Sequence, residues 1–430
     1  MSEPLRIGIA GLGTVGSAVL TLLERNGAVL AERAGRPLQV VAVSARERTR
    51  DRRARLDEMR WYDDPLALAA DPEVEAVVEL IGGADGIALA LVRAALDAGK
   101  PVVSANKALL AHHGAELAEL AEANDATIGF EAAVAGGIPI VKTLREGLVG
   151  NRISRIYGIL NGTCNYILTN MRQSGRGFDE ALSEAQRLGY AEADPSFDID
   201  GVDTAHKLAL LAALAFGCPP DFGAVYTEGI RHISPLDIAF ADEMGYRIKL
   251  LGVARRTEYG LEQRVHPCMV RIGEPISDIE GVFNAVVAEA DQVDSTLYAG
   301  RGAGGGPTAS AVAADLSDLA KGARTPVFAV PSNALKALPA APMQRHVGAY
   351  YFRLMVLDRP GVLADVAACL RDHAVSIESL IQRARKPDEA VPIVLTTHET
   401  SEANLTGALA RIGQLDTVLE PPRLIRIETL

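Results

Sequence analysis

The feature that most constrains the fold is a glycine-rich segment close to the start of the chain. An apolar run at residues 5–10 leads directly into GLGTVG at residues 11–16, and apolar residues then recur at helical spacing. A strand that enters a helix through G-x-G-x-x-G is typical of a turn that binds the pyrophosphate of a dinucleotide. Gly11 permits the tight turn, Gly13 lets the backbone approach phosphate, and Gly16 allows the helix to pack closely on the strand. The alternative is a glycine-rich turn that binds nothing.

Thr14 and Val15 stand where this helix is expected to begin. Backbone N–H groups in the first turn of a helix have no partner within the helix, and they can donate to an anion bound at that end. The whole segment, including Thr14 and Val15, is therefore predicted to bind the cofactor phosphates.

The next predicted strand, residues 38–44, bears on which dinucleotide is bound. Such a strand often ends in an Asp or Glu that binds the ribose 2′-hydroxyl of NAD, whereas this one runs into Ser44, Ala45 and Arg46. An arginine in this place can hold the 2′-phosphate of NADP. We therefore expect NADP in preference to NAD, with Arg46 as the best-placed contact and most of its neighbours solvated. The arginines of this loop are Arg46, Arg48, Arg50, Arg52, Arg53 and Arg55.

Strand and helix patterns alternate through the first third of the chain. Apolar runs at 74–81 and 101–103 are short enough for strands, and residues 87–98 between them have the apolar spacing of a helix. Strands that alternate with such helices form right-handed crossovers and a parallel sheet. The predicted fold class is α/β, with a doubly wound Rossmann-like parallel sheet over residues 1–135. A helix within residues 305–330 is expected to complete this domain.

The rest of the chain is predicted to form two further units. Residues 136–304 mix glycine turns, helices at 178–188 and 204–216 and strand-like runs, which indicates an α+β domain. Prolines then mark a linker at 331–348. The last unit, residues 349–430, has the order strand, helix, strand, strand, helix, strand, which is the βαββαβ arrangement of ferredoxin-like folds.

Composition narrows the class of function and the compartment. Of 430 residues 48% are hydrophobic, enough for several buried cores, and the net charge of −12 argues against nucleic acid as a partner. The longest apolar stretch is too short to span a bilayer, so no membrane partner is expected. The four cysteines lie far apart and no signal peptide is evident, which favours a cytoplasmic protein.

Two segments carry groups suited to catalysis, and the first is SANK at residues 104–107. It follows a predicted strand at the sheet edge where ligands of such folds bind, and it places Ser104 and Lys107 there. Lys107 could fix an anionic group or a substituent of the cofactor ring. A surface lysine that starts a helix explains the pattern equally well.

The second segment, residues 189–207, concentrates carboxylates before a lysine. Asp203 and Lys207 are spaced i, i+4 at the start of an apolar helix, and hence lie on one face of it. Because that helix is predicted to be buried, the charged pair needs either a structural partner or a catalytic task. A lysine beside carboxylates in a partly dry cleft can act as an acid–base group, and Glu192 could bind a substrate ammonium. A purely structural ion pair is the alternative.

With these segments in place, the chain resembles the bacterial, monofunctional homoserine dehydrogenases that carry a C-terminal ACT domain, over essentially its whole length. The most specific match is residues 185–207, where glycine, Asp-Pro, Asp, Gly-x-Asp and lysine follow in order. The other matching motifs are GLGTVG, ELIGG (79–83), SANKALL (104–110), FEAAVAGGIPI (130–140), LNGTCNYIL (160–168) and GRGAGGGPTASAV (300–312). The resemblance implies reversible, NAD(P)-dependent interconversion of L-homoserine and L-aspartate 4-semialdehyde, in the biosynthesis of threonine, methionine and isoleucine.

The resemblance also implies roles for individual residues. Lys207 would give a proton to the aldehyde oxygen, with Asp203 assisting it and holding substrate. Glu192 would bind the substrate amine, Asp198 would be a second substrate-side carboxylate, and Lys107 would lie at the nicotinamide and the reacting centre. The further positions implied to line the cofactor are Ser104, Gly189 and Gly304.

A structural sodium ion and an oligomer are implied in the same way. The ion would be held by the carboxylate of Glu131 and the backbone carbonyls of Val134, Gly136 and Ile138, an oxygen-only shell that suits a hard cation. The domain at 136–304 would bind substrate and pair subunits, and the protein would be a homodimer or homotetramer.

The C-terminal unit resembles an ACT domain through the turn DRPGVL at residues 358–363. Gly361 lets backbone N–H groups at a helix start approach a carboxylate, which suits an amino-acid ligand. The implied effector is L-threonine, as a feedback inhibitor. A domain used only to pair subunits is the alternative.

Other functions stay open at this stage. One is an amino-acid-sensing protein with an inert oxidoreductase half, although the retention of Lys107, Asp203 and Lys207 argues against it. Another is a different amino-acid dehydrogenase on the same fold. Aspartate-semialdehyde dehydrogenase is disfavoured because it needs a thiolate, and Cys164 has no evident histidine partner.

Overall fold

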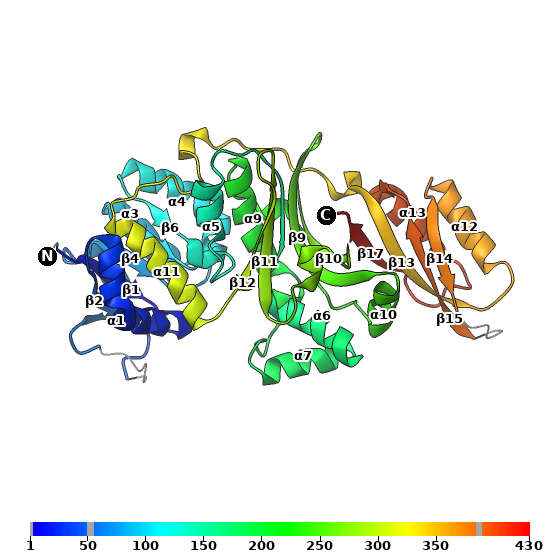
Figure 1. The fold of residues 1–430 in the computed structure, drawn as a ribbon, viewed down its shortest axis with the longest axis horizontal. Helices are drawn as coiled ribbons and strands as arrows, with labels where there is room; N and C mark the ends of the chain where they lie inside the picture. Colours follow the sequence, from blue (N-terminus) through cyan, green and yellow to red (C-terminus); the bar gives the residue numbers. More distant parts are fainter. Residues whose placement is uncertain (1–2, 50–55, 384–388) are drawn as a thin grey trace.

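The computed structural model describes residues 3–49, 56–383 and 389–430. The chain forms a row of three parts, with a sheet near the N-terminus at one end, a large sheet in the middle and a smaller α/β unit at the other end (Figure 1). Arg50, Arg52, Arg53 and Arg55 of the predicted arginine-rich loop lie outside the described residues. No helix in these three described stretches is long and apolar enough to cross a membrane.

The first sheet is parallel, with the strand order β3-β2-β1-β4-β5-β6. This is the doubly wound order, and the direction of winding reverses between β1 and β4, so the Rossmann-like prediction is confirmed. Its strands are β1 (Leu5–Ala10), β2 (Leu38–Ser44), β3 (Arg60–Tyr62), β4 (Ala76–Glu79), β5 (Val102–Ser104) and β6 (Ile128–Gly129). Its helices are α1 (Thr14–Ala34), α2 (Leu66–Ala70), α3 (Ile87–Asp97) and α4 (Lys107–Ala123).

Helix α11 (Gly305–Ala320) returns to this first sheet from far along the chain, as expected. It packs against α1, and the two helices share one core in which Val19 and Leu23 meet Val312 and Leu316. The apolar faces of both helices are thereby buried, which stabilises each by tertiary packing rather than by intrinsic propensity.

The middle part is a mixed sheet, which agrees with the predicted α+β domain. Several of its elements were not predicted, among them the helix α6 and the strands β7, β10 and β12. The strands are β7 (Ile153–Ile159), β8 (Tyr226–Thr227), β9 (Tyr246–Thr257), β10 (Gly260–Arg271), β11 (Phe283–Ala290) and β12 (Asp294–Arg301). The helices are α5 (Ile140–Lys142), α6 (Gly162–Ser174), α7 (Phe178–Arg187), α8 (Ser196–Ile199), α9 (Val202–Phe216) and α10 (Pro235–Glu243).

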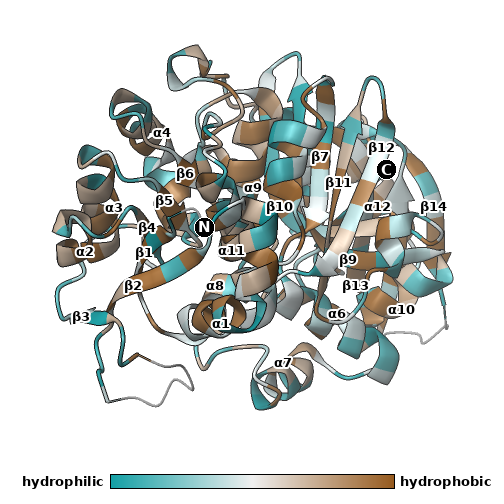
Figure 2. Cartoon of the chain, turned by 60° about the vertical axis from the view of Figure 1, so that its left-hand side comes forward, coloured by the Kyte–Doolittle hydropathy of each residue, from teal (hydrophilic) through white to brown (hydrophobic). Residues whose placement is uncertain are grey.

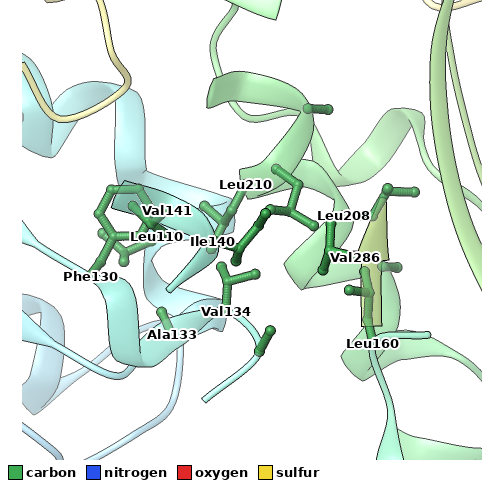
Figure 3. Close-up of a cluster of buried hydrophobic side chains, with 14 of the residues drawn as sticks. Leu110, Phe130, Ala133, Val134, Ile140, Val141, Leu160, Leu208, Leu210 and Val286 are labelled. Atoms are coloured by element: carbon green, nitrogen blue, oxygen red, sulfur yellow. The ribbon is translucent and has the colours of Figure 1, made fainter. Parts of the chain in front are cut away.

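Helix α9 is buried along almost its whole length, as its apolar sequence predicted. It lies close on the sheet because Gly252 of β9 has no side chain, and a Cβ there would come within 3.3 Å of Thr204 and 3.4 Å of Leu208. Figure 3 shows Leu208 beside Leu160, which follows β7, and Val286 of β11, and it shows Leu210 toward the first part of the chain. Apolar residues gather on the strands and on the helix faces turned toward them (Figure 2). A charged group on α9 is therefore placed in a largely apolar environment.

The C-terminal part has the predicted βαββαβ order, with one short extra strand. Its elements are β13 (Val347–Leu357), α12 (Val362–Asp372), β14 (Ile377–Gln382), β15 (Ala390–Thr397), β16 (Thr400–Ser401), α13 (Glu402–Ile412) and β17 (Arg423–Glu428). β17 pairs with β13 on one side and, in parallel, with β10 of the middle sheet on the other. The two sheets are thus continuous, and the C-terminus lies near the centre of the molecule (Figure 1). The sequence did not predict this continuity.

Buried charges join these two sheets. The guanidinium of Arg264 on β10 is only 1% exposed and pairs with Glu428 on β17 and with Glu262 on its own strand. Glu428 also lies close to His266 and Cys268 in an arrangement that could hold a metal, but Arg264 already donates to Glu428 and contacts the His266 ring at 2.8 Å. The guanidinium therefore supplies the positive charge that this cluster needs.

We expect Glu428→Ala to lower the free energy of unfolding by about 3 kcal/mol, because it leaves the buried Arg264 with one fewer carboxylate. Burial would raise the pKa of Glu428, but Arg264 outweighs it and holds this pKa below its ordinary value. The stability that Glu428 contributes is thus fully present above the unfolded pKa of about 4.3 and is lost as pH falls through the folded pKa. Thermal unfolding should show a lower Tm for the variant than for the wild type at pH 7, and this difference in Tm should become smaller as the pH is lowered.

The control for this experiment is Asp372→Ala, which removes an exposed partner of Arg371 and Arg411. An exposed ion pair contributes less than about 1 kcal/mol, so this variant should unfold close to the wild type. Equal shifts in Tm for the two variants would contradict a stabilising role for the pair of Arg264 and Glu428 at the joint between β10 and β17.

Candidate active site

A cavity of about 500 Å³ lies at the carboxyl ends of β1, β2 and β4, where the winding of the parallel sheet reverses. Gly11, Gly13 and Arg46 are among the residues that line it. This edge of a doubly wound sheet is where dinucleotides bind. The structure therefore brings the predicted glycine turn and the predicted Arg46 to one cavity.

The glycine turn has the backbone geometry that the motif requires. Gly11 has φ +96°, and a Cβ on it would come within 2.4 Å of the carbonyl oxygen of Leu80. A Cβ on Gly16 would lie 2.1 Å from the carbonyl oxygen of Gly11, so α1 can approach the strand only with glycine there. At Gly13 a Cβ would meet nothing within 4 Å, which leaves the start of α1 at Thr14 open toward the cavity.

The start of α11 joins this turn from the other end of the sequence. Gly304 caps α11, and a Cβ on the next residue, Gly305, would lie 3.3 Å from the carbonyl oxygen of Thr14. The N-termini of α1 and α11 are thereby neighbours, and N-termini carry positive partial charge. The predicted cofactor position Gly304 lies beside the glycine turn, whereas Gly189 lies in an exposed loop after α7.

Ser104 and Glu79 shape the loops at the same edge of the sheet. The buried carboxylate of Glu79 accepts hydrogen bonds from the backbone N–H groups of Ile81 and Gly82 and from the hydroxyl of Ser104. The hydroxyl of Ser104 in turn accepts the N–H of Asn106, which caps α4. Ser104 is fully buried and its hydroxyl is hydrogen-bonded to Glu79 and Asn106, so its side chain shapes the loop at this edge. Glu79 belongs to the ELIGG motif, but the sequence did not indicate this role for it.

The charged centre of the site is Asp203, in the first turn of α9. Its Oδ2 accepts a hydrogen bond from Nζ of Lys207 at 2.7 Å, and its Oδ1 lies 3.1 Å from Nζ of Lys107 at the start of α4. Lys207 also donates to the carbonyl oxygen of Leu160 at 2.7 Å. Nζ of Lys107 lies 5.4 Å from the ring of Phe197, an arrangement suited to a cation–π contact. The three predicted catalytic residues are therefore brought together from two distant helices.

The charge state of this centre follows from its surroundings. Burial would raise the pKa of Asp203, but the ammonium groups of Lys207 and Lys107 outweigh it and hold the pKa well below its ordinary value. Burial and the negative charge of Asp203 raise the pKa of Asp198. Asp203 is thus a carboxylate at neutral pH, with two cations against it.

The remaining predicted substrate residues lie on the segment before α9. Asp198 is half-buried in α8, and its Oδ1 accepts a hydrogen bond from the amide of Asn161 at 2.8 Å. Glu192 is exposed, and among the described residues its carboxylate joins no ion pair, although its carbonyl accepts the amide of Gln186. The amide of Asn161, which also donates to Asp203, therefore links Asp198 to the charged centre, and no such link to Glu192 is seen among the described residues.

The predicted cation ligand Glu131 is buried behind the glycine turns. Its two carboxylate oxygens accept the N–H groups of Val141 and Lys142, and burial and the nearby Asp315 raise its pKa to about 7. Gly136, on the same loop as Val134 and Ile138, packs against the glycine run, since a Cβ there would lie 2.4 Å from the carbonyl oxygen of Gly302. Lys142 places one ammonium 3.3 Å from Asp315, and a further cation on Glu131 would balance the second of these two buried carboxylates.

Cys164 does not provide a nucleophile. It is fully buried, its Sγ contacts the carbonyl oxygen of Asp198 at 3.2 Å, and burial raises the pKa of its thiol well above the ordinary value. A thiol in this state is not a thiolate at neutral pH. The geometry therefore supports chemistry that uses a proton donor rather than a covalent intermediate.

Comparison with known families covers most of the chain. Residues 139–317 match the family described as homoserine dehydrogenase, residues 11–131 match its NAD-binding domain, and residues 350–417 match the ACT domain. The chain belongs to the homoserine dehydrogenase family. It is thus an NAD(P)-dependent oxidoreductase that acts on a CH–OH group. The inert, sensing alternative loses its support.

Individual relatives agree over the full length. The chain is 46% identical to a homoserine dehydrogenase of Pseudomonas aeruginosa over 100% of both chains, and 45% identical to one of Neisseria gonorrhoeae over 100% of this chain and 99% of the other. The crystal structure of a homoserine dehydrogenase from Thiobacillus denitrificans superposes with a TM-score of 0.94 at 46% identity, covering 99% of this chain and 98% of that one. The S. aureus enzyme gives a TM-score of 0.77 at 29% identity.

We expect Gly16→Ala to weaken binding of the cofactor at least tenfold, because the added methyl group must push α1 away from the turn that faces the phosphates. Gly27→Ala is the matched control on the same helix, where a Cβ meets nothing within 4 Å. That change should leave the cofactor Kd unaltered and raise stability by about 0.5–1 kcal/mol. Calorimetric titration with NADP and with NAD measures the cofactor Kd of each variant, and thermal unfolding measures its stability. An unchanged Kd for Gly16→Ala would refute the predicted role of Gly16.

Proposed function

We propose that this enzyme catalyses the reversible, NAD(P)-dependent interconversion of L-homoserine and L-aspartate 4-semialdehyde, a step in the biosynthesis of threonine, methionine and isoleucine. The observation that carries the proposal is the carboxylate of Asp203 held between Lys207 and Lys107. Lys107 follows β5 at the sheet edge next to β4, and Leu80 and Ile81, which follow β4, line the dinucleotide cavity. The charged centre and the cofactor would therefore meet at one edge of the sheet.

The chemistry asks little of the protein beyond orientation and one proton donor. The nicotinamide, when bound, supplies or accepts the hydride. Nζ of Lys207 donates one hydrogen bond to Asp203 and one to the carbonyl oxygen of Leu160, so its third N–H is available to the substrate oxygen. We assign Lys207 as the proton donor to the aldehyde, Asp203 as the group that orients it, and Lys107 as a second cation at the reacting centre.

The substrate would be held through its ammonium group. Asp198 lies beside the charged centre, and Glu192 lies on the exposed loop before it, so both offer carboxylates to the substrate ammonium. Closing of that loop over the substrate would bring Glu192 inward. Gly189, at the start of the same loop, would then approach the cofactor.

For the cofactor we propose NADP in preference to NAD. Arg46 lines the cavity directly after β2, and a guanidinium there matches the 2′-phosphate. A hyperthermophilic archaeal homoserine dehydrogenase, 28% identical with a TM-score of 0.65 and covering 75% of this chain, has been solved in complex with NADPH. The likeness of the two folds supports the same assignment here.

We also propose a structural sodium ion on Glu131 and the carbonyls of Val134, Gly136 and Ile138. The buried carboxylate with its raised pKa is the supporting feature, since a monovalent cation would keep it charged. The loop it would brace lies against Gly302, next to the glycine run that starts α11. The ion would thus stiffen the cofactor site without taking part in the reaction.

Regulation by L-threonine is proposed for the ACT domain. Arg426 of β17 contacts Glu228 at 2.9 Å, and the N–H of Ile230 in the same loop donates to Ile199, the residue after Asp198. Contacts therefore run from the C-terminal domain to the substrate side of α9.

We further propose that the protein is cytoplasmic, since all four cysteines are free. We propose a homodimer or homotetramer, since the edge strands β12 and β14 leave backbone groups for pairing.

We expect Lys207→Met to lower kcat for L-homoserine oxidation by about 10²–10⁴-fold while leaving cofactor binding intact, because the proton donor is lost. Lys249→Met is a matched control, since Lys249 is also buried and donates to a carbonyl oxygen, that of Ile279, away from Asp203. Absorbance of the reduced nicotinamide measures turnover. Folded wild type that binds cofactor but oxidises another amino alcohol faster than L-homoserine would favour the alternative of a different amino-acid dehydrogenase.

We expect Arg46→Ala to raise KM for NADP by about tenfold with little change in KM for NAD, because only the 2′-phosphate loses a partner. The same absorbance assay with each cofactor gives the ratio of the two kcat/KM values. A parallel loss for both cofactors would show that Arg46 shapes the loop rather than selecting the phosphate.

A further inference from the structure

Asn161 occupies a position at the charged centre that the catalytic roles proposed above do not include. It follows the end of β7 and is the N-cap of α6, and it is only 4% exposed. Its amide Nδ2 donates to Oδ1 of Asp198 and to Oδ2 of Asp203, each at 2.8 Å. One side chain thus binds the two carboxylates that face the substrate.

The orientation of this amide is fixed by its other end. Oδ1 of Asn161 accepts the backbone N–H of Cys164 at 2.8 Å, in the first turn of α6. A flipped amide would put two donors against that N–H and a lone pair against each carboxylate. The hydrogen-bond partners therefore require the nitrogen to face Asp198 and Asp203.

The chemistry of the contact explains why an amide stands here. Two carboxylates close together repel each other, and the cost is high in a buried site. A neutral group with two N–H donors can bridge them, whereas Asp would add a third negative charge and Ser would supply one donor. The charged and titratable groups that also act on Asp198 or Asp203 are Lys107 on α4, Cys164 on α6, and His206 and Lys207 on α9.

The segment that follows β7 also fixes the orientation of the Lys207 side chain. Lys207 Nζ has two acceptors, Oδ2 of Asp203 and the carbonyl oxygen of Leu160, the residue before Asn161. The carbonyl of Leu160 is thus fixed by the backbone after β7, and the carboxylate of Asp203 is held by the Asn161 amide. The direction of the third N–H of Lys207 depends on both.

We propose that Asn161 is a positioning residue that aligns Asp203 with Lys207 and sets its distance from Asp198. The inference rests on the proposed function, in which Lys207 gives its proton to the substrate oxygen. Asn161 acts through Asp203 and does not itself touch the reacting atoms. Its removal should therefore lower kcat more than it changes binding of the cofactor.

The test compares Asn161→Asp with the wild type. Aspartate keeps the acceptor that caps α6 but loses both N–H donors and adds a negative charge, so the bridge between the carboxylates is lost while the helix cap is kept. Circular dichroism and the cofactor Kd check that the variant is folded. At pH 8 we expect kcat for homoserine oxidation to fall about 10²-fold, with the cofactor Kd within twofold. As pH falls, the new carboxyl group takes up a proton and can donate one hydrogen bond, so the ratio of variant to wild-type kcat should rise.

Asn165→Ala is the matched control on the same helix. Asn165 is 1% exposed and its amide donates to the carbonyl oxygens of Ile279 and Phe283, not to a carboxylate. It should lower Tm but leave kcat and its pH profile within twofold of the wild type. If Asn161→Asp keeps kcat within twofold at pH 8, or if its kcat ratio does not change with pH, the positioning role is overturned.

A second measurement separates this inference from the proposed function. Carbon-13 NMR titration of labelled aspartate carboxyl groups, assigned with Asp198→Asn and Asp203→Asn, reports the contact without turnover. We expect Asn161→Asp to raise the pKa of Asp203 or of Asp198 relative to the wild type. A wild type inactive on L-homoserine would overturn the proposed function, whereas unchanged titration of both carboxyl groups would overturn the role of Asn161.

Discussion

The buried carboxylate of Asp203 is the interaction on which the rest of the site depends. A negative charge in the first turn of an apolar helix is unfavourable unless cations and hydrogen-bond donors surround it. Lys207 supplies one cation from the same helix, and Lys107 supplies another from α4. The first sheet and the middle sheet must therefore be held in one relative position, and the apolar core that they share around α9 does this (Figure 3).

The need to pair a buried charge also applies where the middle sheet meets the C-terminal domain. β17 extends the middle sheet beyond β10, and the pair of Arg264 and Glu428 crosses that joint in a buried setting. Arg426, next along β17, reaches the Glu228 loop that backs α8. Because the joint is a continuous sheet with paired charges, the C-terminal domain is a structural part of the catalytic unit and is not a loosely tethered module.

The sequence predicted the parts of the fold whose periodicity is local. Strand 38–44 appears with the predicted bounds, and the βαββαβ order of the C-terminal domain is confirmed. The sequence did not indicate that helix α1 extends to Ala34, because its later turns bury only Ala34 and show no apolar stripe. The long strand β10 was missed because it buries polar residues such as Glu262 and Arg264, whose partners His346 and Glu428 lie far along the chain.

For the site, the sequence by itself determined which residue types are available and their local spacing. The i, i+4 relation of Asp203 and Lys207 and the glycine turn follow from helix geometry and from the φ that Gly11 needs. Only the tertiary structure decided that Lys107 faces Asp203, that Gly304 lies beside the glycine turn, and that Asn161 bridges two carboxylates. These contacts join residues far apart in the chain, and the packing of α9 between two sheets, which no local pattern encodes, brings them together.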